Sequence, residues 1–598
     1  METVSLTING RPVTVEKGKT VLQAAIENGI AVPYYCYHPG ISIDGSCRVC
    51  VVKIEKMPKL QTSCSTVCAD GMVVQTSVPE VVEARTGVFE FLLLNHPLDC
   101  PVCDKGGECP LQDFSYNFGP EQSRMDLPRR TFDGEGVKAD VDFGPTLMLN
   151  RNRCILCTRC VRFMRDIAGD AQINIIDRGY GSQIATFRDE GVHSIISGNL
   201  MDVCPVGAIT TRDYRCKSRP WDNPQVVDTI CTQCARGCST TAWLRAKPEW
   251  AKGARLIRFT PRFNPDVNGY WMCDIGRFNY HWIEASTRLR HPLVRLDTGA
   301  AEAVSWGDAF ERLKDVLTRS TRNGLQFLVS AHASHEELFL FTRIRAGVSA
   351  PITMSWRHSP KTQPSGTTFH VPDVDAPNVA GARLLGLLTG RIDDPVEPPD
   401  LSVLKEDVQA GRVSILYICD PGPDGSLGET EWIVDARRRG VLPLLVVQGI
   451  LLTDLARAAD IVLPGASYVE KEASYTNERG TLQGTSRVLA PPGEALEDWQ
   501  IIVQAAAALG CPVEYGSAAQ VRADVGARYP GERGLAGIET LTFGRAMEAR
   551  NWLQTSNPSE RWKWDFMFQD LPPVKGAVDP RALPIPAGAV RLREVKGD

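Results

Sequence analysis

The sequence predicts a multidomain protein, with α+β domains first and an α/β domain after them. At 598 residues the chain exceeds the roughly 250–300 residues at which a single hydrophobic core stops growing. Four groups of cysteines, one of them with a histidine, fall between Cys36 and Cys273. From about residue 290 onward cysteine almost disappears, and patterns typical of strands alternate with patterns typical of helices.

The composition indicates a soluble globular protein whose cysteines bind metal. The chain is 43% hydrophobic and 23% charged, and its net charge of −5 gives no reason to expect a nucleic-acid partner. The 19 cysteines lie in a large chain with no visible secretory signal, which favours reduced metal ligands over disulfides. No apolar run approaches the roughly 20 residues that a membrane helix needs. Any link to a membrane is therefore expected to come through a partner.

The first 78 residues predict two strands and a helix that lead into a cysteine-bearing loop. Apolar and polar residues alternate over 4–8 and 13–15, with the hairpin turn Asn9-Gly10 between them. A helix is expected over about 20–29. This order is typical of a small β-grasp domain of the ferredoxin type, which we place at residues 1–78.

The loop after this helix supplies four candidate ligands of a [2Fe–2S] cluster. Plant-type sites have the spacing C-x4-C-x2-C with a remote fourth cysteine. Here ten residues separate the first two cysteines, and the C-x2-C pair is kept. The spacing predicts the same kind of cluster in an enlarged loop, held by Cys36, Cys47, Cys50 and Cys64.

Residues 79–120 predict a helix followed by a short loop that concentrates metal ligands. Ser77-Val-Pro-Glu80 has the form of a capping box, and the helix is expected to end near Leu94, before Pro97. Gly106 and Gly107 are expected to turn the loop tightly and to direct amide groups at sulfur. One imidazole and three thiolates suit iron or zinc, and the candidates are His96, Cys100, Cys103 and Cys109.

A bacterial ferredoxin pattern follows within residues 145–218. The run C-x2-C-x2-C is followed, after 43 further residues, by a Cys-Pro pair. A two-cluster ferredoxin would carry another cysteine soon after Cys160, but position 164 is Met and no second run appears. One [4Fe–4S] cluster is therefore expected in a ferredoxin-like domain, on Cys154, Cys157, Cys160 and Cys204.

Residues 224–282 hold a fourth set with the spacing C-x2-C-x3-C and a remote cysteine. Four thiolates suit structural zinc as well as a [4Fe–4S] cluster, so this spacing alone leaves both open. Three other iron–sulfur patterns in the same chain favour the cluster, on Cys231, Cys234, Cys238 and Cys273. The remaining cysteines are expected to be spare or structural: Cys68, Cys216, Cys419 and Cys511.

Residues 285–570 predict a parallel sheet covered by helices. Strands are expected at Leu325–Ser330, Val413–Cys419, Leu442–Val447 and Asp460–Leu463. Helices are expected at His335–Ala346, Glu429–Arg439 and Thr453–Ala459. Two Pro-rich loops, about 359–377 and 391–402, interrupt this region, and a Pro-rich tail at 571–598 is expected to run extended.

Four successive ligand sets indicate electron conduction. A cluster carries one electron at a time, and the protein tunes its potential through ligand type, burial and hydrogen bonds to sulfur. The order of these sets resembles the family of the large iron–sulfur subunit, the 75 kDa subunit, of NADH-quinone oxidoreductase (respiratory complex I). The resemblance covers essentially the whole chain and is most specific over residues 1–280.

This resemblance implies one [2Fe–2S] cluster at the first set and three [4Fe–4S] clusters at the others, the fourth lying off the main path. It implies an electron relay from the flavin-bearing NADH module toward the quinone-reducing module of an NADH:quinone oxidoreductase, with NADH and quinone chemistry in other subunits. The implied partners are the flavin/NADH-binding subunit, the small [2Fe–2S] subunit and the quinone-side Fe–S subunits. The implied place is peripheral, on the cytoplasmic face of the inner (plasma) membrane.

The region after residue 285 resembles a molybdopterin-oxidoreductase domain, most clearly at Ala459–Pro464, Glu470–Glu472 and Thr476-Asn477. In molybdenum-containing relatives such as formate dehydrogenases, a cysteine or selenocysteine ligates the metal, often just before a histidine. Here Arg357 precedes His358, and a guanidinium has no lone pair to offer a metal. We expect a degenerate domain that binds no molybdopterin.

Two alternatives stay open. A catalytic α subunit of an NAD-linked molybdenum formate dehydrogenase shares this N-terminal layout, although a second ferredoxin cluster and the molybdenum ligand are missing. A zinc-stabilised scaffold is the other, and it explains the one-histidine set poorly. No GxSxG, HExxH or Walker motif is present. The pair His332/His335, beside Glu336 and Glu337, is expected to cap and solvate a helix start, and the glycine loop 422–428 to form an ordinary turn.

Overall fold

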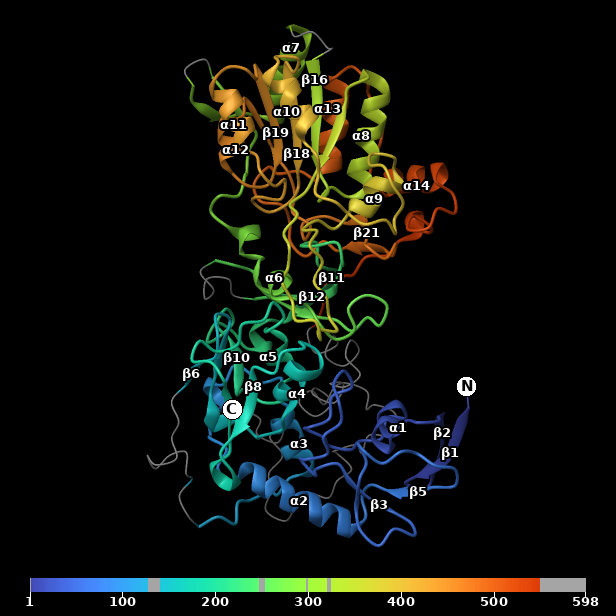
Figure 1. Ribbon diagram of the computed structural model, residues 1–598. Helices are drawn as coiled ribbons and strands as arrows, with labels where there is room; N and C mark the ends of the chain where they lie inside the picture. The colour runs from blue at the N-terminus through green and yellow to red at the C-terminus, as the bar shows by residue number, and fades with distance from the viewer. Residues whose placement is uncertain are drawn as a thin grey trace, which may run out of the picture. The chain divides into compact units, whose positions relative to one another are not determined.

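The chain divides into two compact units (Figure 1). The computed structural model describes residues 2–126, 129, 140–246, 253–296, 299–319 and 324–548. Unit 1 contains residues 1–222 together with the short segment Pro364–Thr368, and unit 2 contains residues 223–363 and 369–548. The predicted tail at 571–598 lies outside the described residues. Within the described ranges, no helix is long and apolar enough to cross a membrane.

Unit 1 begins with a five-stranded sheet whose strand order is β2-β1-β5-β3-β4. The hairpin between β1 and β2 turns at Asn9 and Gly10, both with positive φ, as a two-residue hairpin loop requires. Thr20 and Gln23 form a capping box that starts the helix α1. The predicted strands and helix are confirmed; the bounds are β1 (Thr3–Ile8), β2 (Arg11–Glu16), α1 (Val21–Glu27), β3 (Val51–Ile54), β4 (Gln61–Thr62) and β5 (Val73–Gln75).

Two helices, α2 (Pro79–Leu94) and α3 (Pro110–Phe118), flank the loop with the histidine-containing ligand set. The helix α2 begins and ends as predicted, but the predicted capping box is wrong. Its N-cap is Val78, and no side chain caps it. Pro79 occupies the first helical position, where its missing N–H costs nothing because that group has no partner in any helix. A 3-10 turn, η1 (Cys100–Val102), lies within the loop.

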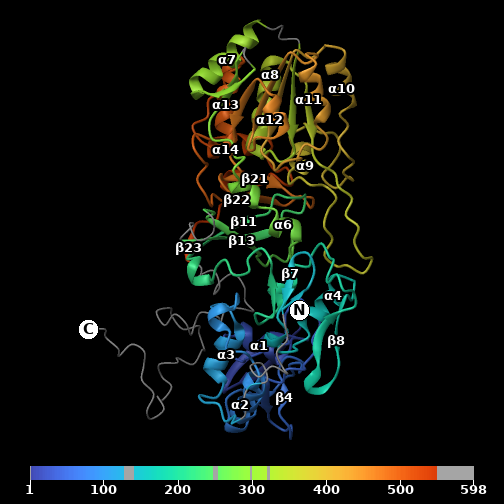
Figure 2. The same ribbon diagram turned by 90° about the vertical axis from the view of Figure 1, so that its left-hand side faces the viewer.

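The rest of unit 1 combines small sheets with the short helices α4 and α5. A three-stranded sheet has the order β10-β7-β6, and β8 pairs with β9 in a separate hairpin. The helix α4 packs against β8 and α5, and Figure 2 shows α4 beside β8. The bounds are β6 (Val141–Asp142), β7 (Leu147–Leu149), η2 (Arg151–Arg153), α4 (Arg159–Asp166), β8 (Ile173–Ile176), η3 (Gly179–Gly181), β9 (Gln183–Thr186), α5 (Asn199–Val203), β10 (Ile209–Thr211) and η4 (Pro220–Asp222).

The segment Pro364–Thr368 completes unit 1 at the C-terminal end of α4. The hydroxyl of Thr367 and the amide of Thr368 both donate to the carbonyl of Ile167, at 3.0 and 2.9 Å. Gly169 and Gly366 approach so closely that a Cβ on Gly169 would lie 2.3 Å from the carbonyl carbon of Gly366. Part of the predicted Pro-rich loop 359–377 is thus packed into the unit that precedes it in sequence.

Unit 2 starts with a four-stranded antiparallel sheet of order β13-β12-β11-β23, and β11 also packs against the hairpin β21–β22 (Figure 2). In its core the ring of Phe259 stacks on that of Tyr468 and meets that of Tyr280 edge to face. The bounds are β11 (Gln225–Ile230), β12 (Ser239–Leu244), β13 (Leu256–Pro261), α6 (Asp274–Phe278), η6 (His281–Glu284), β21 (Ala473–Thr476), β22 (Leu482–Thr485) and β23 (Met547–Glu548).

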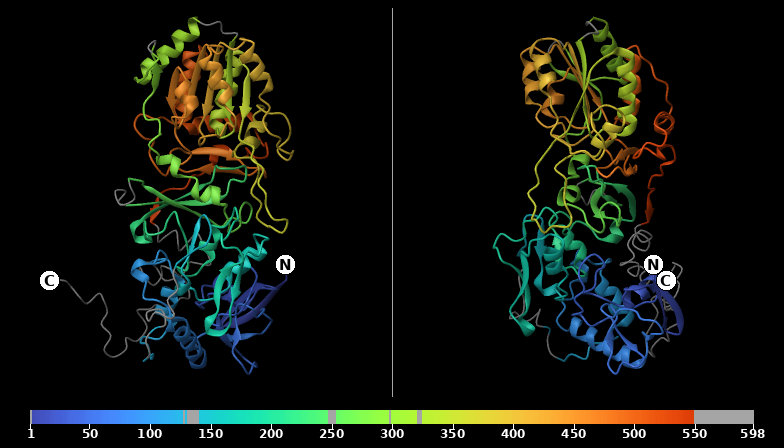
Figure 3. Two further views of the ribbon diagram at one scale, coloured as in Figure 1. Left: turned by 60° about the vertical axis from the view of Figure 1, so that its left-hand side comes forward. Right: turned by 45° about the vertical axis from the view of Figure 1, so that its right-hand side comes forward.

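The larger part of unit 2 is a seven-stranded sheet with helices on both faces (Figure 3, right). Its order is β15-β14-β20-β19-β18-β16-β17, and β20, β19, β18, β16 and β17 run parallel, as the alternating pattern predicts. One apolar core lies under α7, α8, α13 and α14, and a second lies under α10, α11 and α12. The strands are β14 (Leu293–Arg295), β15 (Ala301–Ala303), β16 (Leu325–Ser330), β17 (Ile352–Ser355), β18 (Ile415–Asp420), β19 (Leu444–Gly449) and β20 (Ile461–Pro464). The helices are α7 (Trp306–Arg319), α8 (His335–Val348), α9 (Val379–Leu384), α10 (Ser402–Gln409), α11 (Glu431–Arg438), α12 (Asp454–Ala458), α13 (Asp498–Ala508), α14 (Ala518–Arg528) and η8 (Ile538–Thr540).

A buried ion network joins α8 to α13 in unit 2. The ammonium of Lys471 lies 2.5 Å from Glu337 Oε1 and 2.8 Å from Asp498 Oδ2, and all three side chains are almost wholly inaccessible to solvent. Burial of charges at this depth is tolerated because the ammonium and both carboxylates find partners in one another.

The predicted role of His332 and His335, to cap and solvate the start of α8, is wrong. His332 and His335 are buried, not solvated, and Ser334 is the residue that caps the helix. The imidazole of His335 contacts the hydroxyls of Ser474 and Thr476. Burial lowers the pKa of both histidines, so each is held as neutral imidazole inside the domain.

The charge on Glu337 makes the stability of unit 2 depend on pH. Burial raises the pKa of Glu337 from 4.5 to about 7, against the opposing influence of Lys471. The folded state then binds this proton more tightly than the unfolded state, so its contribution to stability is complete below about pH 4.5 and is lost as the pH rises through about 7. We expect Glu337→Gln to flatten this part of the pH dependence, measured as guanidinium unfolding midpoints of the full chain. Burial also raises the pKa of Asp420, to about 6, so Asp420 makes stability depend on pH in the same direction. This contribution is present in the wild type and in Glu337→Gln alike. An unchanged slope in Glu337→Gln would contradict the assignment.

Candidate metal centres

The sixteen predicted ligands all lie in described parts of the chain, and they form four sets that we call sites 1 to 4. Sites 1, 2 and 3 belong to unit 1, and site 4 belongs to unit 2. The sites are defined by Cys36, Cys47, Cys50 and Cys64 (site 1), by His96, Cys100, Cys103 and Cys109 (site 2), by Cys154, Cys157, Cys160 and Cys204 (site 3), and by Cys231, Cys234, Cys238 and Cys273 (site 4). In the described ranges, no three such side chains close around one metal ion.

Hydrogen bonds link the four thiols of site 1 in the order Cys47, Cys36, Cys64 and Cys50. The amide of Cys36 donates to the sulfur of Cys47 at 3.5 Å. Hydrogen bonds with Cys47 and Cys64 hold the pKa of Cys36 far below its ordinary value, and a hydrogen bond with Cys64 lowers the pKa of Cys50 to about 7. The same contacts raise the pKa values of Cys47 and Cys64. These hydrogen bonds place the four thiols next to one another, which suits a compact cluster.

The C-x2-C turns of sites 1 and 3 contain residues in the left-handed backbone region. Arg48 has a φ of 59° and Leu156 a φ of 52°, values that a side chain makes unfavourable. The amide of Leu156 donates to the sulfur of Cys154 at 3.4 Å. Strained backbone of this kind is maintained where it serves the site, here by turning amides toward sulfur.

Site 2 surrounds a cavity of about 170 Å³ that is lined by all four of its predicted ligands. Amides of Leu111 and Gln112, at the start of α3, hydrogen-bond the sulfur of Cys109, and the amide of Lys105 hydrogen-bonds that of Cys103. The predicted role of the two glycines is correct only in part. Gly107 has a φ of 84°, but the amides of Gly106 and Gly107 donate to the carbonyl of Cys103 and to Gln112 Oε1, not to sulfur.

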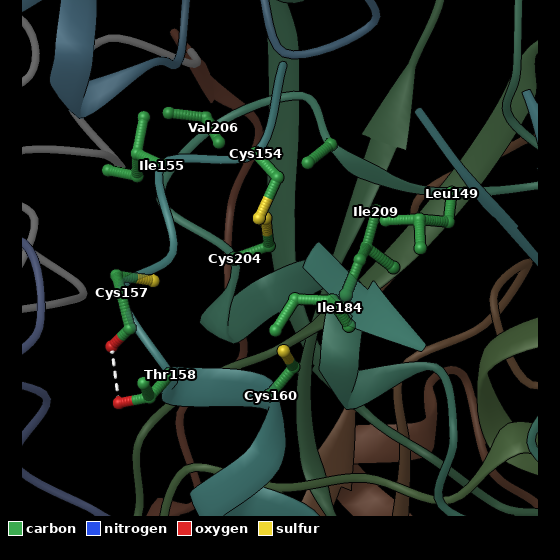
Figure 4. Close-up of a pocket in the computed structure, with 11 residues that line it drawn as sticks. Leu149, Cys154, Ile155, Cys157, Thr158, Cys160, Ile184, Cys204, Val206 and Ile209 are labelled. Carbon is green, nitrogen blue, oxygen red and sulfur yellow. Dashed lines mark hydrogen bonds between the residues drawn. The ribbon is translucent and has the colours of Figure 1, made fainter. Parts of the chain in front are cut away.

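Site 3 places four sulfur atoms around one small cavity, and Figure 4 shows them facing a common space. Cys154 follows the turn η2, Cys160 lies in the first turn of α4, and Cys204 follows α5. Mostly apolar side chains, together with Thr158, complete the lining. The fold thus brings the remote Cys204 to the same cavity as the three cysteines of the C-x2-C-x2-C run, an arrangement that suits a cluster.

Site 4 lies at the tip of the hairpin β11–β12 and at the start of α6. The amide of Cys231 donates to the carbonyl of Cys238 at 2.8 Å, and the amide of Gly276 donates to the sulfur of Cys273 at 3.3 Å. A Cβ on Gly276 would lie 2.8 Å from the sulfur of Cys231, so only glycine fits there. All four cysteines are buried.

The donor groups of sites 2, 3 and 4 fit a bound cluster. Burial raises the pKa of Cys109 to about 12, that of Cys157 to about 11 and that of Cys231 to about 12. Such thiols become thiolates only when a cation replaces the proton, which is what binding of iron does. Burial, with a smaller contribution from Arg153, lowers the pKa of His96 to about 4, leaving the neutral imidazole that binds metals.

One segment of chain joins site 2 to site 3. Cys204 belongs to site 3, and the next residue, Pro205, has its carbonyl 3.8 Å from the sulfur of Cys109 in site 2. A Cβ on Gly207 would lie only 2.0 Å from the sulfur of Cys103. The backbone of Cys204–Gly207 therefore runs directly from one ligand set to the other.

A buried arginine makes a second link between these two sites. Arg153 precedes Cys154 and donates from Nε to Asp99 Oδ2 at 2.8 Å, within the His96–Cys109 loop. Its positive charge acts on the thiol of Cys103, where it opposes the effect of burial on the pKa. Tyr35 packs against the rings of Phe89 and Phe114 and lies near Cys47 of site 1 and Cys109 of site 2.

Sequence reasoning missed the residues that connect the sites. Arg153 and Gly207 link site 2 to site 3, and Arg159 and Arg162 of α4 link site 1 to site 3. The spacing of these residues matches no ligand pattern. A usable signal was the density of arginines around the cysteines of site 3, at positions 151, 153, 159, 162 and 165. Cys216, expected to be structural, is exposed.

Comparisons with known protein families match four stretches of the chain in succession. They are a 2Fe-2S iron-sulfur cluster binding domain (residues 1–79), the NADH-ubiquinone oxidoreductase-G iron-sulfur binding region (85–124), the ferredoxin-like domain of NADH-quinone oxidoreductase subunit 3 (144–210) and a molybdopterin oxidoreductase domain (379–508). This order confirms the predicted fold class.

Full-length relatives settle the family. The mitochondrial NADH-ubiquinone oxidoreductase 78 kDa subunit of Candida albicans is 30% identical, over 88% of this chain and 85% of its own length. The chain belongs to the family of the large iron–sulfur subunit of NADH-quinone oxidoreductase. A bacterial NADH-quinone oxidoreductase subunit of this family, from Streptomyces coelicolor, is 38% identical over 57% of this chain and 39% of its own length. The iron-sulfur protein 1 of NADH dehydrogenase from Solanum tuberosum is 39% identical over 53% and 41%. Large iron–sulfur subunits of this family are components of an oxidoreductase complex, and the formate dehydrogenase alternative is not favoured.

Among solved structures, a crystal structure of NAD+-reducing [NiFe]-hydrogenase in the H2-reduced state is 28% identical over 36% of this chain and 91% of that chain, with a TM-score of 0.32. In the molybdopterin-like domain of this large iron–sulfur subunit, the residue at the expected metal-ligand place, Arg357, is largely exposed and donates to the hydroxyl of Ser359.

Proposed function

We propose that the chain carries one [2Fe–2S] cluster at site 1 and [4Fe–4S] clusters at sites 2, 3 and 4, and conducts electrons through them. The ligands are the sixteen residues that define the sites. When bound, each cluster supplies a one-electron carrier. The residues of this chain bind it, exclude water from it and direct amides at its sulfur atoms.

The observation that carries this proposal is that site 3 shares contacts with both other sites of unit 1. The segment Cys204–Gly207 touches ligands of site 2, and the helix α4 contacts the loop of site 1. Electron transfer between clusters falls steeply with distance, so shared contacts favour it. We infer the order site 1, site 3, site 2, which differs from the order of the ligands along the chain.

The complex around the chain follows from the same proposal. Electrons enter from the flavin/NADH-binding subunit and the small [2Fe–2S] subunit, and leave toward the quinone-side Fe–S subunits of an NADH:quinone oxidoreductase. The chain is a peripheral subunit on the cytoplasmic face of the membrane, and NADH and quinone react elsewhere in the complex. The four cluster domains occupy residues 1–78, 79–120, 145–218 and 224–282, ahead of the degenerate molybdopterin-like domain at 285–570.

Replacement of a site 2 ligand tests this function. In the assembled complex, Cys103→Ala is expected to remove one cluster signal from the low-temperature EPR spectrum, and the iron content should fall by about four per complex. NADH-to-quinone turnover should stop, whereas NADH oxidation by ferricyanide at the flavin should persist. Cys216→Ala, which changes an exposed cysteine outside the four sites, is the control. Normal quinone reduction by Cys103→Ala would refute the relay role of site 2, and about one molybdenum per chain would favour a formate dehydrogenase.

A further inference from the structure

The helix α4 carries two buried arginines between site 1 and site 3. Arg162 is 3% exposed and Arg159 is 6% exposed. The Nη2 atom of Arg162 donates both to the carbonyl of Cys36, a site 1 ligand, and to the carbonyl of Cys157, a site 3 ligand, at 2.5 and 3.1 Å. Arg159 repeats the arrangement one turn earlier, donating to the carbonyls of Tyr37 and Val203, which adjoin ligands of the two sites.

In the part of the chain that the structure describes, neither guanidinium group hydrogen-bonds a carboxylate. The hydrogen bonds of Arg159 go to main-chain carbonyls, and Arg162 adds only the carbonyl of Ser42 and the hydroxyl of Thr158. Among the described residues, neither forms an ion pair. Asp44 acts on Arg162 through space, but its hydrogen bond comes from Thr158. Arg288, which is equally buried, shows how a buried arginine is usually neutralised, because it lies 2.6 Å from the carboxylate of Glu470.

Two buried positive charges without anions are costly unless another negative group is present. The groups that face them are ligand sulfurs. The thiols of Cys36 and Cys157 both act on the charge of Arg162, and Arg159 in turn acts on Cys157. A cluster held by four thiolates keeps a net negative charge, which grows by one on reduction. Among the described residues, Asp44 acts on Arg162 without forming an ion pair, so the clusters at sites 1 and 3 would add the counter-charge that is otherwise incomplete.

We propose that Arg162, assisted by Arg159, is a positioning residue shared by sites 1 and 3, whose charge stabilises the reduced state of both clusters and whose hydrogen bonds fix their ligand loops to each other. The inference rests on the proposed function, because it requires clusters at both sites. Reduction adds one electron to a cluster and none to Arg162, whose guanidinium stays protonated throughout.

The test is a redox titration of the assembled complex, followed by low-temperature EPR, for the wild type, Arg162→Gln, Arg162→Lys and Arg165→Gln. Removal of the charge in Arg162→Gln should lower the midpoint potentials of sites 1 and 3 together. At a fixed solution potential, the ratio of reduced to oxidised cluster should fall about tenfold at each of the two sites. This corresponds to a fall of about 59 mV in midpoint potential for a one-electron couple. Site 2 should not change. Arg162→Lys, which keeps the charge, should retain most of both potentials.

Arg165→Gln is the matched control. Arg165 lies on the same helix, but its side chain is 58% exposed and paired with Asp166, so its loss should leave both potentials unchanged. Unchanged potentials in an Arg162→Gln protein that holds both clusters would overturn the proposal. So would a shift at one site alone.

Cluster loading is measured in the same samples, as iron and EPR spin counts. If Arg162→Gln loses the clusters whereas Arg162→Lys keeps them at wild-type potentials, the requirement for charge is supported. Loss of clusters from both variants would show that only the shape of the guanidinium matters, and would overturn the electrostatic role. Absence of site 1 and site 3 signals from the wild type would instead refute the proposed function.

Discussion

Gly207→Ala is expected to empty site 2 while leaving the fold of unit 1 in place. The new Cβ would lie 2.0 Å from the sulfur of Cys103 and 3.3 Å from the Cβ of Lys105, so the sulfur has to leave its position. Loss of a buried neighbour of a metal ligand costs about 10- to 100-fold in affinity or activity, and here the ligand itself is displaced. We expect the site 2 EPR signal to vanish and quinone reduction to fall by at least this factor.

Gly87→Ala provides the matched control for this change. Gly87 lies in α2, ahead of the same ligand loop, and a Cβ there would meet nothing within 4 Å. Alanine should stabilise the helix by up to about 1 kcal/mol and leave all cluster signals intact. Retention of the site 2 signal in Gly207→Ala would show that Cys103 has another way to reach its cluster.

Lys471→Met is expected to destabilise unit 2 by about 3–5 kcal/mol, because it leaves the carboxylates of Glu337 and Asp498 buried without their cation. The measurement is hydrogen exchange of the α8 and α13 amides in the full chain, which reports the free energy of opening of this part of the fold. The clusters proposed for sites 1 to 3 belong to unit 1, and their EPR signals should not change at temperatures where unit 2 stays folded.

Two further variants make this prediction specific. Lys314→Met removes an exposed lysine from α7 and should stay within about 0.5 kcal/mol of the wild type. The double variant Lys471→Met/Glu337→Gln removes one of the two carboxyl groups left without the ammonium and should recover part of the loss. A Lys471→Met protein as stable as Lys314→Met would show that the ion network contributes nothing.

The order of strands and helices could be predicted from the sequence because it depends on short-range spacing, whereas the four ligand sets stay predictions made from their spacing. A C-x2-C-x2-C run, a hairpin turn such as Asn9-Gly10 and a strand–helix alternation need no knowledge of distant residues. The pattern also predicts the bounds of α2 within a residue or two, although it assigns the cap to Ser77 where the structure has Val78.

The contacts between sites could not be predicted in this way, because they join residues far apart in the chain. Arg162 reaches the carbonyl of Cys36 across 126 positions, and main-chain carbonyls carry no sequence signature. The burial of His332 and His335 was missed for a related reason. Glutamates beside a helix start usually indicate solvent, and only the tertiary fold brings Lys471 and Arg522 to neutralise them.

The packing of Pro364–Thr368 onto Ile167 limits how the protein can be divided into fragments. The chain returns to unit 1 long after residue 222, so a single cut in the gene cannot separate the two units. A fragment that stops at residue 222 retains every ligand of sites 1, 2 and 3, but lacks the five residues that hold the end of α4, the helix with Cys160, Arg159 and Arg162. A minimal electron-carrying fragment would need that short peptide restored through a designed linker. A short segment from the later part of the chain thus contributes to the structure of the unit that contains sites 1 to 3.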